Sequence, residues 1–342
     1  MVTVMEELRG TVAFIVATQL KDGESPSPIE RASQRHVHIP RPRGMGMFRA
    51  QWALLRGAWP MRRDIDVLHA NGLTEAVVAL PVAVFARLPV VVWIHNWERP
   101  RPFRAVEPLL RLVGRRWRWL AVSDLAAGLV PWRVPELLAN PVSADVVPSR
   151  RLEHDDFRVV YLAGSDRPSK GFDLLPEIIE AVEDENVRWI LYTSRPFTTK
   201  DSRVTRSWER LTQELAHRVD VRDRVESVSI AFAEADLVVA PSRRESFNRV
   251  IAEAIVNGVP FVASDISPHR QLAERSDAGL LFPLEDPKSG GELIRDLSRT
   301  PARVAELSAS AKKNCSFLSA STIASTLWGE WRSVAAQGVE IG

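Results

Sequence analysis

The segment "DLVVAPSRRESFNRVIAEAIVNGVPFVASD" (residues 236–265) contains an apolar run, a polar turn, a helical pattern and a second apolar run. The first run ends at Pro241, and apolar residues with helical spacing extend from about Phe247 to Val256. Gly258 follows as a C-terminal stop signal. A strand, a helix and another strand in this order predict a parallel sheet covered by helices.

Two glutamates, Glu245 and Glu253, lie eight positions apart around the start of this predicted helix. On one continuous helix they would be about 80° apart and would not share a face. If the helix begins just after Glu245, that residue lies at its N-terminal end, and Glu253 lies about two turns inside. The backbone amides of residues 246–249 would then be unpaired donors at the positive end of the helix dipole, where a phosphate can bind.

A carboxylate beside a bound phosphate needs neutral hydroxyl partners, because two negative groups repel each other. Vicinal diols supply such partners, so Glu253 is a candidate for binding the two hydroxyls of a ribose. Glu245 is a candidate for hydroxyls of a sugar beyond a diphosphate, since eight helical residues span at most about 12 Å. The alternative is that both glutamates are solvated surface side chains.

The same alternation of apolar runs and helical patterns extends over both halves of the chain, and residues 137–156 interrupt it with turn formers and charges. It predicts an α/β protein with two Rossmann-like domains, whose parallel sheets face a cleft. The predicted parts are residues 1–148, residues 149–316, and a final helix at 317–342 that crosses back to the first domain. Predicted strands cover residues 11–17, 35–39, 66–70, 90–94, 119–123, 158–164, 188–194, 236–240, 260–265 and 279–283.

The composition of the 342 residues is that of a soluble globular protein, with 45% hydrophobic and 26% charged residues. Cys315 is the single cysteine, which excludes an intramolecular disulfide and a cysteine-based zinc site. Residues 11–17 are similar to the apolar part of a signal peptide, but two glutamates precede them, which favours a buried strand. Residues 77–94 are long enough to span a bilayer, yet Arg87 and two prolines interrupt them. We therefore expect a cytoplasmic protein.

Positive charge gathers in the first half of the chain. Residues 1–150 hold 20 Lys+Arg against 13 Asp+Glu, net +7, whereas the remainder holds 25 against 30, net −5. Within this half, residues 40–63 contain six arginines together with Trp52 and Trp59. This segment could form a basic amphipathic surface for anionic lipid, at the inner face of a membrane, or for an acidic acceptor. The alternative is an ordinary solvated helix, and we expect no nucleic-acid partner.

The residues around the two glutamates follow the pattern of a known enzyme family. Its members show a strand ending in Pro-Ser, a Glu followed by a small residue and Phe-Gly, and a helix with a second Glu. A Gly-x-Pro turn and a strand ending in Ser or Thr follow. The segment thus resembles the EX7E region of the GT-B glycosyltransferases, specifically the retaining family-4 type. The matching positions are Pro241-Ser242, Glu245-Ser246-Phe247-Asn248, Glu253, Gly258-Val259-Pro260 and Ala263-Ser264-Asp265.

A second match lies in "YLAGSDRPSKGFDLLPEIIEAV" (residues 161–182), which is similar to the loop after the first strand of that family's carboxy-terminal domain. The resemblance implies that Lys170 contacts the donor diphosphate and stabilises the charge on the leaving group. The family usually has an arginine six residues earlier, where this chain has Gly164. Arg167 in the same loop is a candidate substitute, and without one the departure predicts impaired catalysis.

Weaker matches occur in the first half, at residues 90–98, 119–129 and 140–145. They are similar to landmarks of the family's amino-terminal domain, and they place His95 in the cleft, near the donor sugar and its β-phosphate. The alternative for His95 is a structural hydrogen bond. Residues 18–34 lack the family's Gly-Gly loop, so the acceptor side differs from that of relatives.

The resemblance implies transfer of a hexosyl or N-acetylhexosaminyl group from a nucleotide diphosphate sugar to a hydroxyl acceptor, with retention of configuration and without a cofactor. UDP-sugars are the commonest donors in the family and GDP-sugars are the second candidates, while the short segment 224–235 leaves the base open. Asp64 and Asp66 form a DxD that precedes a strand rather than lying in a metal-binding loop, so no metal is assigned. The implied roles are catalytic for Lys170, Glu245 and His95, and donor-binding for Arg167, Ser246, Phe247, Asn248 and Glu253.

Two other interpretations remain open. One is a nucleotide-sugar-binding protein with little or no turnover, which the glycine in place of arginine at position 164 allows. A GT-B epimerase or phosphorylase is the second alternative, against which the EX7E region argues. The sequence leaves the donor sugar, the acceptor and the oligomeric state undetermined.

Overall fold

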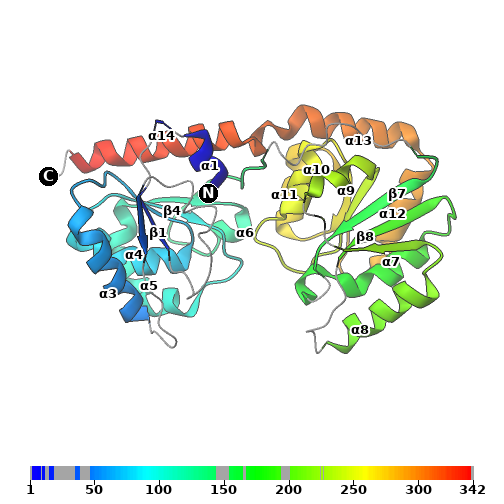
Figure 1. Cartoon of the computed structure of the whole chain (residues 1–342), viewed down its shortest axis with the longest axis horizontal. Helices are drawn as coiled ribbons and strands as arrows, with labels where there is room; N and C mark the ends of the chain where they lie inside the picture. Colours follow the sequence, from blue (N-terminus) through cyan, green and yellow to red (C-terminus); the bar gives the residue numbers. More distant parts are fainter. Residues whose placement is uncertain are drawn as a thin grey trace. The chain divides into compact units, whose positions relative to one another are not determined.

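The computed structural model (Figure 1) divides into two compact units, one formed by Met1–Pro141 with Ala320–Gly342 and the other by Val142–Ser319. The domain boundary predicted at residue 148 falls within residues 144–153, outside the described residues. The structure describes residues 2–8, 10–11, 15–18, 35–38, 47–143, 154–164, 167–193, 201–223, 225 and 227–339.

The second unit contains a six-stranded sheet in which every neighbouring pair of strands is parallel. The strand order is β12-β11-β10-β7-β8-β9, so the chain builds outward from β7 on one side and then resumes with β10 on the other. Open α/β sheets bind ligands at the carboxyl ends of the strands beside such a reversal. The strands are β7 (Phe157–Leu162), β8 (Val187–Tyr192), β9 (Val219–Arg222), β10 (Leu237–Ala240), β11 (Phe261–Ser264) and β12 (Gly279–Phe282).

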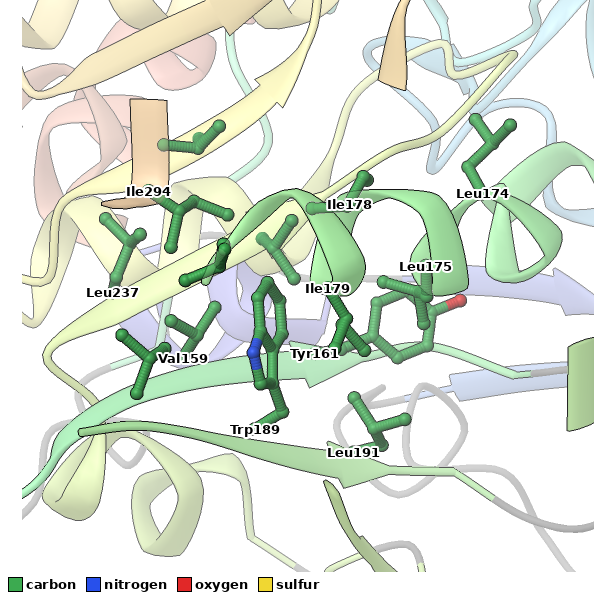
Figure 2. Packing of buried hydrophobic residues seen from close by; sticks show 14 of the residues in the cluster. Val159, Tyr161, Leu174, Leu175, Ile178, Ile179, Trp189, Leu191, Leu237 and Ile294 are labelled. Atoms are coloured by element: carbon green, nitrogen blue, oxygen red, sulfur yellow. The ribbon is translucent and has the colours of Figure 1, made fainter. Parts of the chain in front are cut away.

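Both faces of this sheet are covered, because Val159 and Val160 are fully buried although successive side chains of a strand point to opposite faces. Figure 2 shows Tyr161 and Trp189 beneath helix α7 (Leu175–Ala181), and Leu175, Ile178 and Ile179 of that helix belong to the same buried cluster. Burial of each large apolar side chain stabilises the fold by about 1.5–3 kcal/mol. The apolar runs of the sequence are therefore the strands of a buried parallel sheet.

Helices and short helical turns connect the strands of the second unit. They are η4 (Pro168–Lys170), η5 (Phe172–Leu174), α8 (Ser202–Glu209), η6 (Arg210–Glu214), α9 (Val228–Glu234), α10 (Arg249–Val256), α11 (Ser267–Ser276), α12 (Pro287–Ser298), α13 (Pro301–Asn314) and η7 (Cys315–Leu318).

The first unit contains a four-stranded parallel sheet in the order β3-β4-β5-β6 and a separate parallel pair of strands, β1 and β2. Its strands are β1 (Ile15–Thr18), β2 (Arg35–His38), β3 (Leu68–Ala70), β4 (Val90–Ile94), β5 (Arg118–Ala121) and β6 (Glu136–Leu137). Its helices are α1 (Val2–Glu7), α3 (Met47–Ala58), η1 (Trp59–Met61), α4 (Leu73–Phe85), α5 (Arg101–Val113), η2 (Gly114–Arg116), α6 (Asp124–Ala127) and α14 (Ala320–Val339).

Helix α14, although last in the chain, packs within the first unit. Its Glu330 carboxylate accepts hydrogen bonds from Arg118 of β5. The indole N–H of Trp331 donates to Nδ1 of His69 in β3 at 3.1 Å. The buried Trp93 of β4 donates its own indole N–H to the Leu138 carbonyl at 3.0 Å. The contacts of Glu330 and Trp331 fix the helix against β5 and β3 of the same sheet.

The parallel α/β architecture predicted from the sequence is confirmed in both units. The apolar interval 77–94 forms most of helix α4, a turn and strand β4 rather than one long segment. Arg87 adopts a positive φ of 53° in that turn. Among the described helices, none combines the length and the hydropathy that a membrane crossing requires. Helix α1 has no counterpart in the sequence prediction.

Candidate functional site

The turn between β10 and α10 buries Glu245, which is 5% exposed. The hydroxyl of Ser242 donates to its Oε1 at 3.0 Å. The Ser264 hydroxyl, at the end of β11, donates in turn to the carbonyl of Ser242. Glu245 is therefore a buried carboxylate at the carboxyl end of the central strand β10, and not a solvated surface group.

Helix α10 begins at Arg249, two positions later than the sequence predicted, because Asn248 is its N-cap. The Asn248 side chain accepts a hydrogen bond from the Ile251 N–H at 3.3 Å, which satisfies one of the free donors of a helix start. Within the described residues, no protein group accepts a hydrogen bond from the N–H groups of residues 247–250. The N–H groups without a protein acceptor thus include those of Phe247 and Asn248 and extend into the first turn of the helix, and their contact with an anion stays a prediction.

Glu253 lies one turn further along α10 and is 6% exposed. Its Oε1 accepts a hydrogen bond from Arg249 at 3.0 Å. Burial raises the pKa of this carboxyl group, whereas the Arg249 charge and hydrogen bond lower it. The group is poorly solvated, which is the condition under which a carboxylate gains most from neutral hydroxyl donors.

Lys170 ends the short turn η4 in the loop after β7, and its Nζ lies 2.5 Å from Oε1 of Glu245. The next residue, Gly171, has a φ of +67°, and a Cβ built there would lie 1.8 Å from the Pro241 carbonyl oxygen. Only glycine permits this close approach of the two loops. The N–H of Arg243 strengthens it by donating to the Ser169 carbonyl at 2.7 Å. The residues that follow β7 and β10 therefore form one structural unit at the point where the strand order reverses.

Arg243 is a site-forming residue that the sequence did not identify. Its guanidinium donates to both oxygens of Asp173, with Nη1–Oδ1 at 2.5 Å and Nη2–Oδ2 at 2.9 Å. Such a two-point contact fixes geometry as well as charge. The neighbouring Arg244 is exposed, so the sequence offers no signal that distinguishes the two arginines. The ion pair between Arg243 and Asp173 joins the turn η5 to the loop that bears Glu245.

A hollow opens at the carboxyl ends of β7 and β10, between these two loops and the helix start. Its polar lining comes from Lys170, Ser242 and Asn248, and Val250 of α10 also contributes. The sequence-predicted residues Lys170, Glu245, Asn248 and Glu253 are thus gathered on adjacent elements of one unit. Ser246 is half-buried in the same turn and Phe247 is buried.

Arg167 and Gly164 are the other two positions of the Lys170 loop that the sequence singled out. Arg167, at the start of η4, has an exposed side chain, and Gly164 is partly buried. The Lys170 N–H donates to the Arg167 carbonyl at 2.9 Å, so the backbone of Arg167 shapes the turn. A contact between its guanidinium and a diphosphate stays a prediction.

His95 directly follows β4 in the first unit and packs against Trp93, with ring centroids 4.6 Å apart and ring planes tilted by 55°. Burial lowers its pKa to about 4, so the ring is neutral at pH 7. His69, in β3 of the same sheet, was not singled out by the sequence, and burial lowers its pKa to about 3. Among the described residues, neither His69 nor His95 has a hydrogen-bond partner at its buried Nε2. In each case the feature of the sequence that could identify the residue is a histidine at or near the carboxyl end of a predicted parallel strand.

In the described part of the chain, no group of three or more acidic, histidine or cysteine side chains is arranged so that it could hold a metal ion. Charge at the site comes instead from Lys170, Arg249 and the buried acids that they pair with. The arrangement combines free amide donors, one ammonium and two carboxylates. It can bind an anionic group flanked by hydroxyl groups.

Two α/β units of this kind, with such a site at the carboxyl ends of a parallel sheet, define the GT-B fold. A solved structure of Anabaena HepE in complex with UDP and glucose is similar over 97% of this chain and 94% of that chain, with a TM-score of 0.76 and 18% identity. Sucrose-phosphate synthase from Thermosynechococcus elongatus is similar over 98% and 92%, with a TM-score of 0.78 and 17% identity. At these identities the likeness establishes the fold.

Residues 156–299 match the model of the family described as "Glycosyl transferases group 1". Together with the curated relatives and the fold, this match confirms the glycosyltransferase class predicted from the sequence. The matched residues include Lys170, Glu245 and Glu253, so the match covers the whole site of the second unit.

Curated relatives extend the likeness into the first unit. The phosphatidyl-myo-inositol mannosyltransferase of Mycobacterium tuberculosis is 26% identical over 259 residues, 70% of this chain and 65% of that protein. The lipopolysaccharide core mannosyltransferase LpcC of Rhizobium leguminosarum is 24% identical over 270 residues, 74% of each chain. The chain thus spans slightly less than two thirds of the mycobacterial relative that it matches.

Proposed function

We propose that this protein transfers a sugar from a nucleotide diphosphate sugar to a hydroxyl acceptor. The observation that carries the proposal is the meeting of Lys170 and Glu245, 2.5 Å apart, beside a helix start with unpaired amides. Each group suits one part of such a donor. The amides and Lys170 suit the diphosphate, and the buried carboxylates suit the hydroxyls on either side of it.

In the proposed reaction the bond between the anomeric carbon and the β-phosphate oxygen breaks, and the acceptor oxygen bonds to that carbon on the same face. The acceptor proton leaves with the diphosphate. Lys170 and the amides before and within the first turn of α10 offset the negative charge that develops on the leaving group. Glu245 holds sugar hydroxyls and Glu253 holds the ribose diol. No protein nucleophile and no bound metal take part, and configuration is retained.

His95 is proposed to act on the donor sugar or its β-phosphate. Its low pKa keeps the ring neutral, and a neutral imidazole can donate or accept a hydrogen bond without adding charge. UDP-sugars are the favoured donors, with GDP-sugars as the second class. The proposal of a nucleotide sugar as donor is supported by relatives named as mannosyltransferases and by a similar structure named as a complex with UDP and glucose.

A donor panel tests this function. The purified protein is incubated with UDP- and GDP-linked hexoses and N-acetylhexosamines, with and without EDTA, and products are identified by mass spectrometry. We expect release of one nucleoside diphosphate, in an amount that EDTA does not reduce. NMR of the product should show the same anomeric configuration as in the donor. Nucleotide binding without turnover would instead identify a binding protein, and inversion at C2 of the sugar would identify an epimerase.

We also propose that the first unit contacts an anionic lipid surface. Trp52 of α3 is 60% exposed and Phe85 of α4 is 67% exposed. Together with Trp59 and Arg56 they line an apolar hollow of about 420 Å³. The Arg62 guanidinium lies 4.4 Å from the centre of the Trp59 ring. Exposed aromatic groups beside arginines are typical of surfaces that bind the lipid headgroup region.

Vesicle sedimentation tests this contact. The wild type should sediment with vesicles containing anionic lipid and not with zwitterionic vesicles, and Trp52→Ser with Phe85→Ser should abolish the association. Ile230→Ser is the matched control, because Ile230 is 55% exposed on α9 of the other unit. Equal sedimentation of the wild type and the double variant would refute the proposed surface.

A further inference from the structure

The N-cap of α10 rests on a histidine from the next helix. His269, in the first turn of α11, has no exposed surface. Its Nδ1 lies 2.9 Å from the Ser264 carbonyl oxygen, and its Nε2 lies 2.9 Å from Nδ2 of Asn248. A carbonyl oxygen only accepts, so Nδ1 carries the proton and Nε2 is the acceptor. The Asn248 amide then donates Nδ2–H to the ring and offers its oxygen to the Ile251 N–H.

We propose that His269 is a positioning residue of the donor site, which acts through Asn248 to fix the start of helix α10. This inference rests on the proposed nucleotide-diphosphate site. Asn248 stands where the resemblance to the glycosyltransferases leads one to expect glycine. Glycine carries no side chain that could link the helix start to a neighbouring helix. In this chain the helix start is instead tied to the end of β11 through two hydrogen bonds of one buried ring.

The network holds only with a neutral ring. Burial lowers the pKa of His269 to about 4; the Ser264 carbonyl and Asp265 raise it, and Lys170 lowers it. If Nε2 of His269 carried a proton, it and Nδ2 of Asn248 would be two hydrogen-bond donors in contact, with no acceptor between them. Asn248 would have to turn its amide over, and its Nδ2 would then meet the Ile251 N–H in place of an acceptor oxygen. The cap and the direction of the free amides at residues 247–250 would be lost together.

The His269 ring, through Asn248, sets the position of the backbone N–H groups of residues 247–250. The unpaired N–H groups flank Asn248 on both sides, and Glu245 lies three residues before it. A shift of the cap therefore moves the amides relative to Lys170, which is held by the other loop. Loss of the ring should therefore weaken diphosphate binding by misplacing these N–H groups.

A double-mutant cycle tests this role. The variants are His269→Phe, which removes both hydrogen bonds, His269→Gln, which can restore one donor and one acceptor, and Asn248→Gly. Calorimetric titration with UDP, and with GDP in parallel, measures nucleotide affinity. We expect His269→Phe to raise Kd about tenfold, the size of effect that loss of an N-cap produces, and His269→Gln to stay within about threefold of the wild type. In the Asn248→Gly background His269→Phe should cause no further change. An equal effect in both backgrounds would show a merely structural role and would refute the proposal.

Two readouts that need no nucleotide separate this proposal from the proposed function. Nitrogen NMR should show the neutral Nδ1–H tautomer of His269 at pH 7, and a charged ring or the Nε2–H tautomer would overturn the inference. Hydrogen exchange at the Ile251 amide should accelerate about tenfold in His269→Phe but not in His269→Gln. A wild type that binds neither UDP nor GDP would refute the proposed function, while these two measurements would still decide whether His269 holds the cap.

Discussion

The Lys170 ammonium donates to the Glu245 carboxylate at 2.5 Å, and this ion pair helps to join the loop after β7 to the loop after β10. The side chains of Lys170 and Glu245 are 23% and 7% exposed. A second pair, between Arg249 and Glu253, occupies the helix start. Both acids of the site are thus neutralised by its own cations. A nucleotide diphosphate sugar bound as proposed would have to compete with these two ion pairs.

Replacing Lys170 by methionine should reduce affinity for the nucleoside diphosphate by at least about tenfold, since a hydrogen bond to a charged group contributes about 1.5–3 kcal/mol. It should also lower the free energy of unfolding by about 1–3 kcal/mol, because Glu245 is left buried without its cation. Calorimetric titration with UDP or GDP and urea unfolding check the two effects. Lys288→Met, at an exposed lysine of α12, is the control.

The double variant Lys170→Met with Glu245→Gln separates binding from stability. Neutralising the buried carboxylate removes the cost of leaving it unpaired, so most of the lost stability should return. Nucleotide affinity should not return, because neither the ammonium nor the carboxylate is restored. Recovery of affinity in the double variant would contradict the assigned role of Lys170.

Glu253→Gln should weaken binding of a ribonucleoside diphosphate without weakening the fold. Burial raises the pKa of Glu253 above its ordinary value, so its contribution to stability is present at low pH and is lost as pH rises through the folded pKa. A neutral amide avoids this loss at pH 7. We expect affinity to fall about tenfold or more, with an unchanged or slightly higher unfolding midpoint. An affinity for UDP equal to that of the wild type would remove the ribose role, and Glu292→Gln on α12 serves as the control.

The order of strands and helices in the second unit followed from local sequence, because buried parallel strands are apolar runs such as residues 157–162 and 237–240. The helix start was placed two residues too early. Asn248 was taken as helical because the helical spacing of apolar residues was followed back to Phe247, although asparagine is a preferred N-cap residue. The two glutamates were found because their spacing and context are local in sequence.

Other parts of the site depend on contacts between residues far apart in the chain. Arg243 meets Asp173 across 70 positions, and His269 meets Asn248 across 21. No periodicity marks such pairs, since periodicity reports burial on one element and not the partner that a side chain meets. Gly171 is likewise visible as a glycine, but its contact with the Pro241 carbonyl arises only when two loops pack together.

Gly171→Ala should be strongly destabilising. The residue has a φ of +67°, and its Cβ would lie 1.8 Å from a carbonyl oxygen of the neighbouring loop. Backbone strain of this kind costs about 1–3 kcal/mol even before the clash is counted. Thermal unfolding should show a lower midpoint, and nucleotide affinity should fall because the Lys170 loop is displaced.

Gly329→Ala is the matched control for this substitution. Gly329 lies inside helix α14, and a Cβ there meets no atom within 4 Å. Alanine in a helix interior is favoured over glycine by about 0.8–1 kcal/mol. The control should therefore raise the unfolding midpoint, and a similar loss in both variants would contradict the close approach at Gly171.

Stability should fall as pH drops below 7, through the buried histidines. Burial lowers the pKa of His95 and His269 to about 4 and that of His69 to about 3. Unfolded histidine binds a proton near pH 6.5, so the unfolded state takes up more protons than the folded state between that pH and about 4. The stabilisation by each neutral ring is complete above pH 6.5 and is lost as pH falls, by about 1.4 kcal/mol per pH unit within this window. Urea unfolding at pH 7, 6 and 5 measures the slope, and His269→Gln should remove one histidine's share of it. If His269→Gln leaves the slope of the unfolding free energy against pH unchanged, His269 is charged or solvated in the folded protein. A similar loss of slope in His95→Gln would assign that share of the pH dependence to His95 of the first unit.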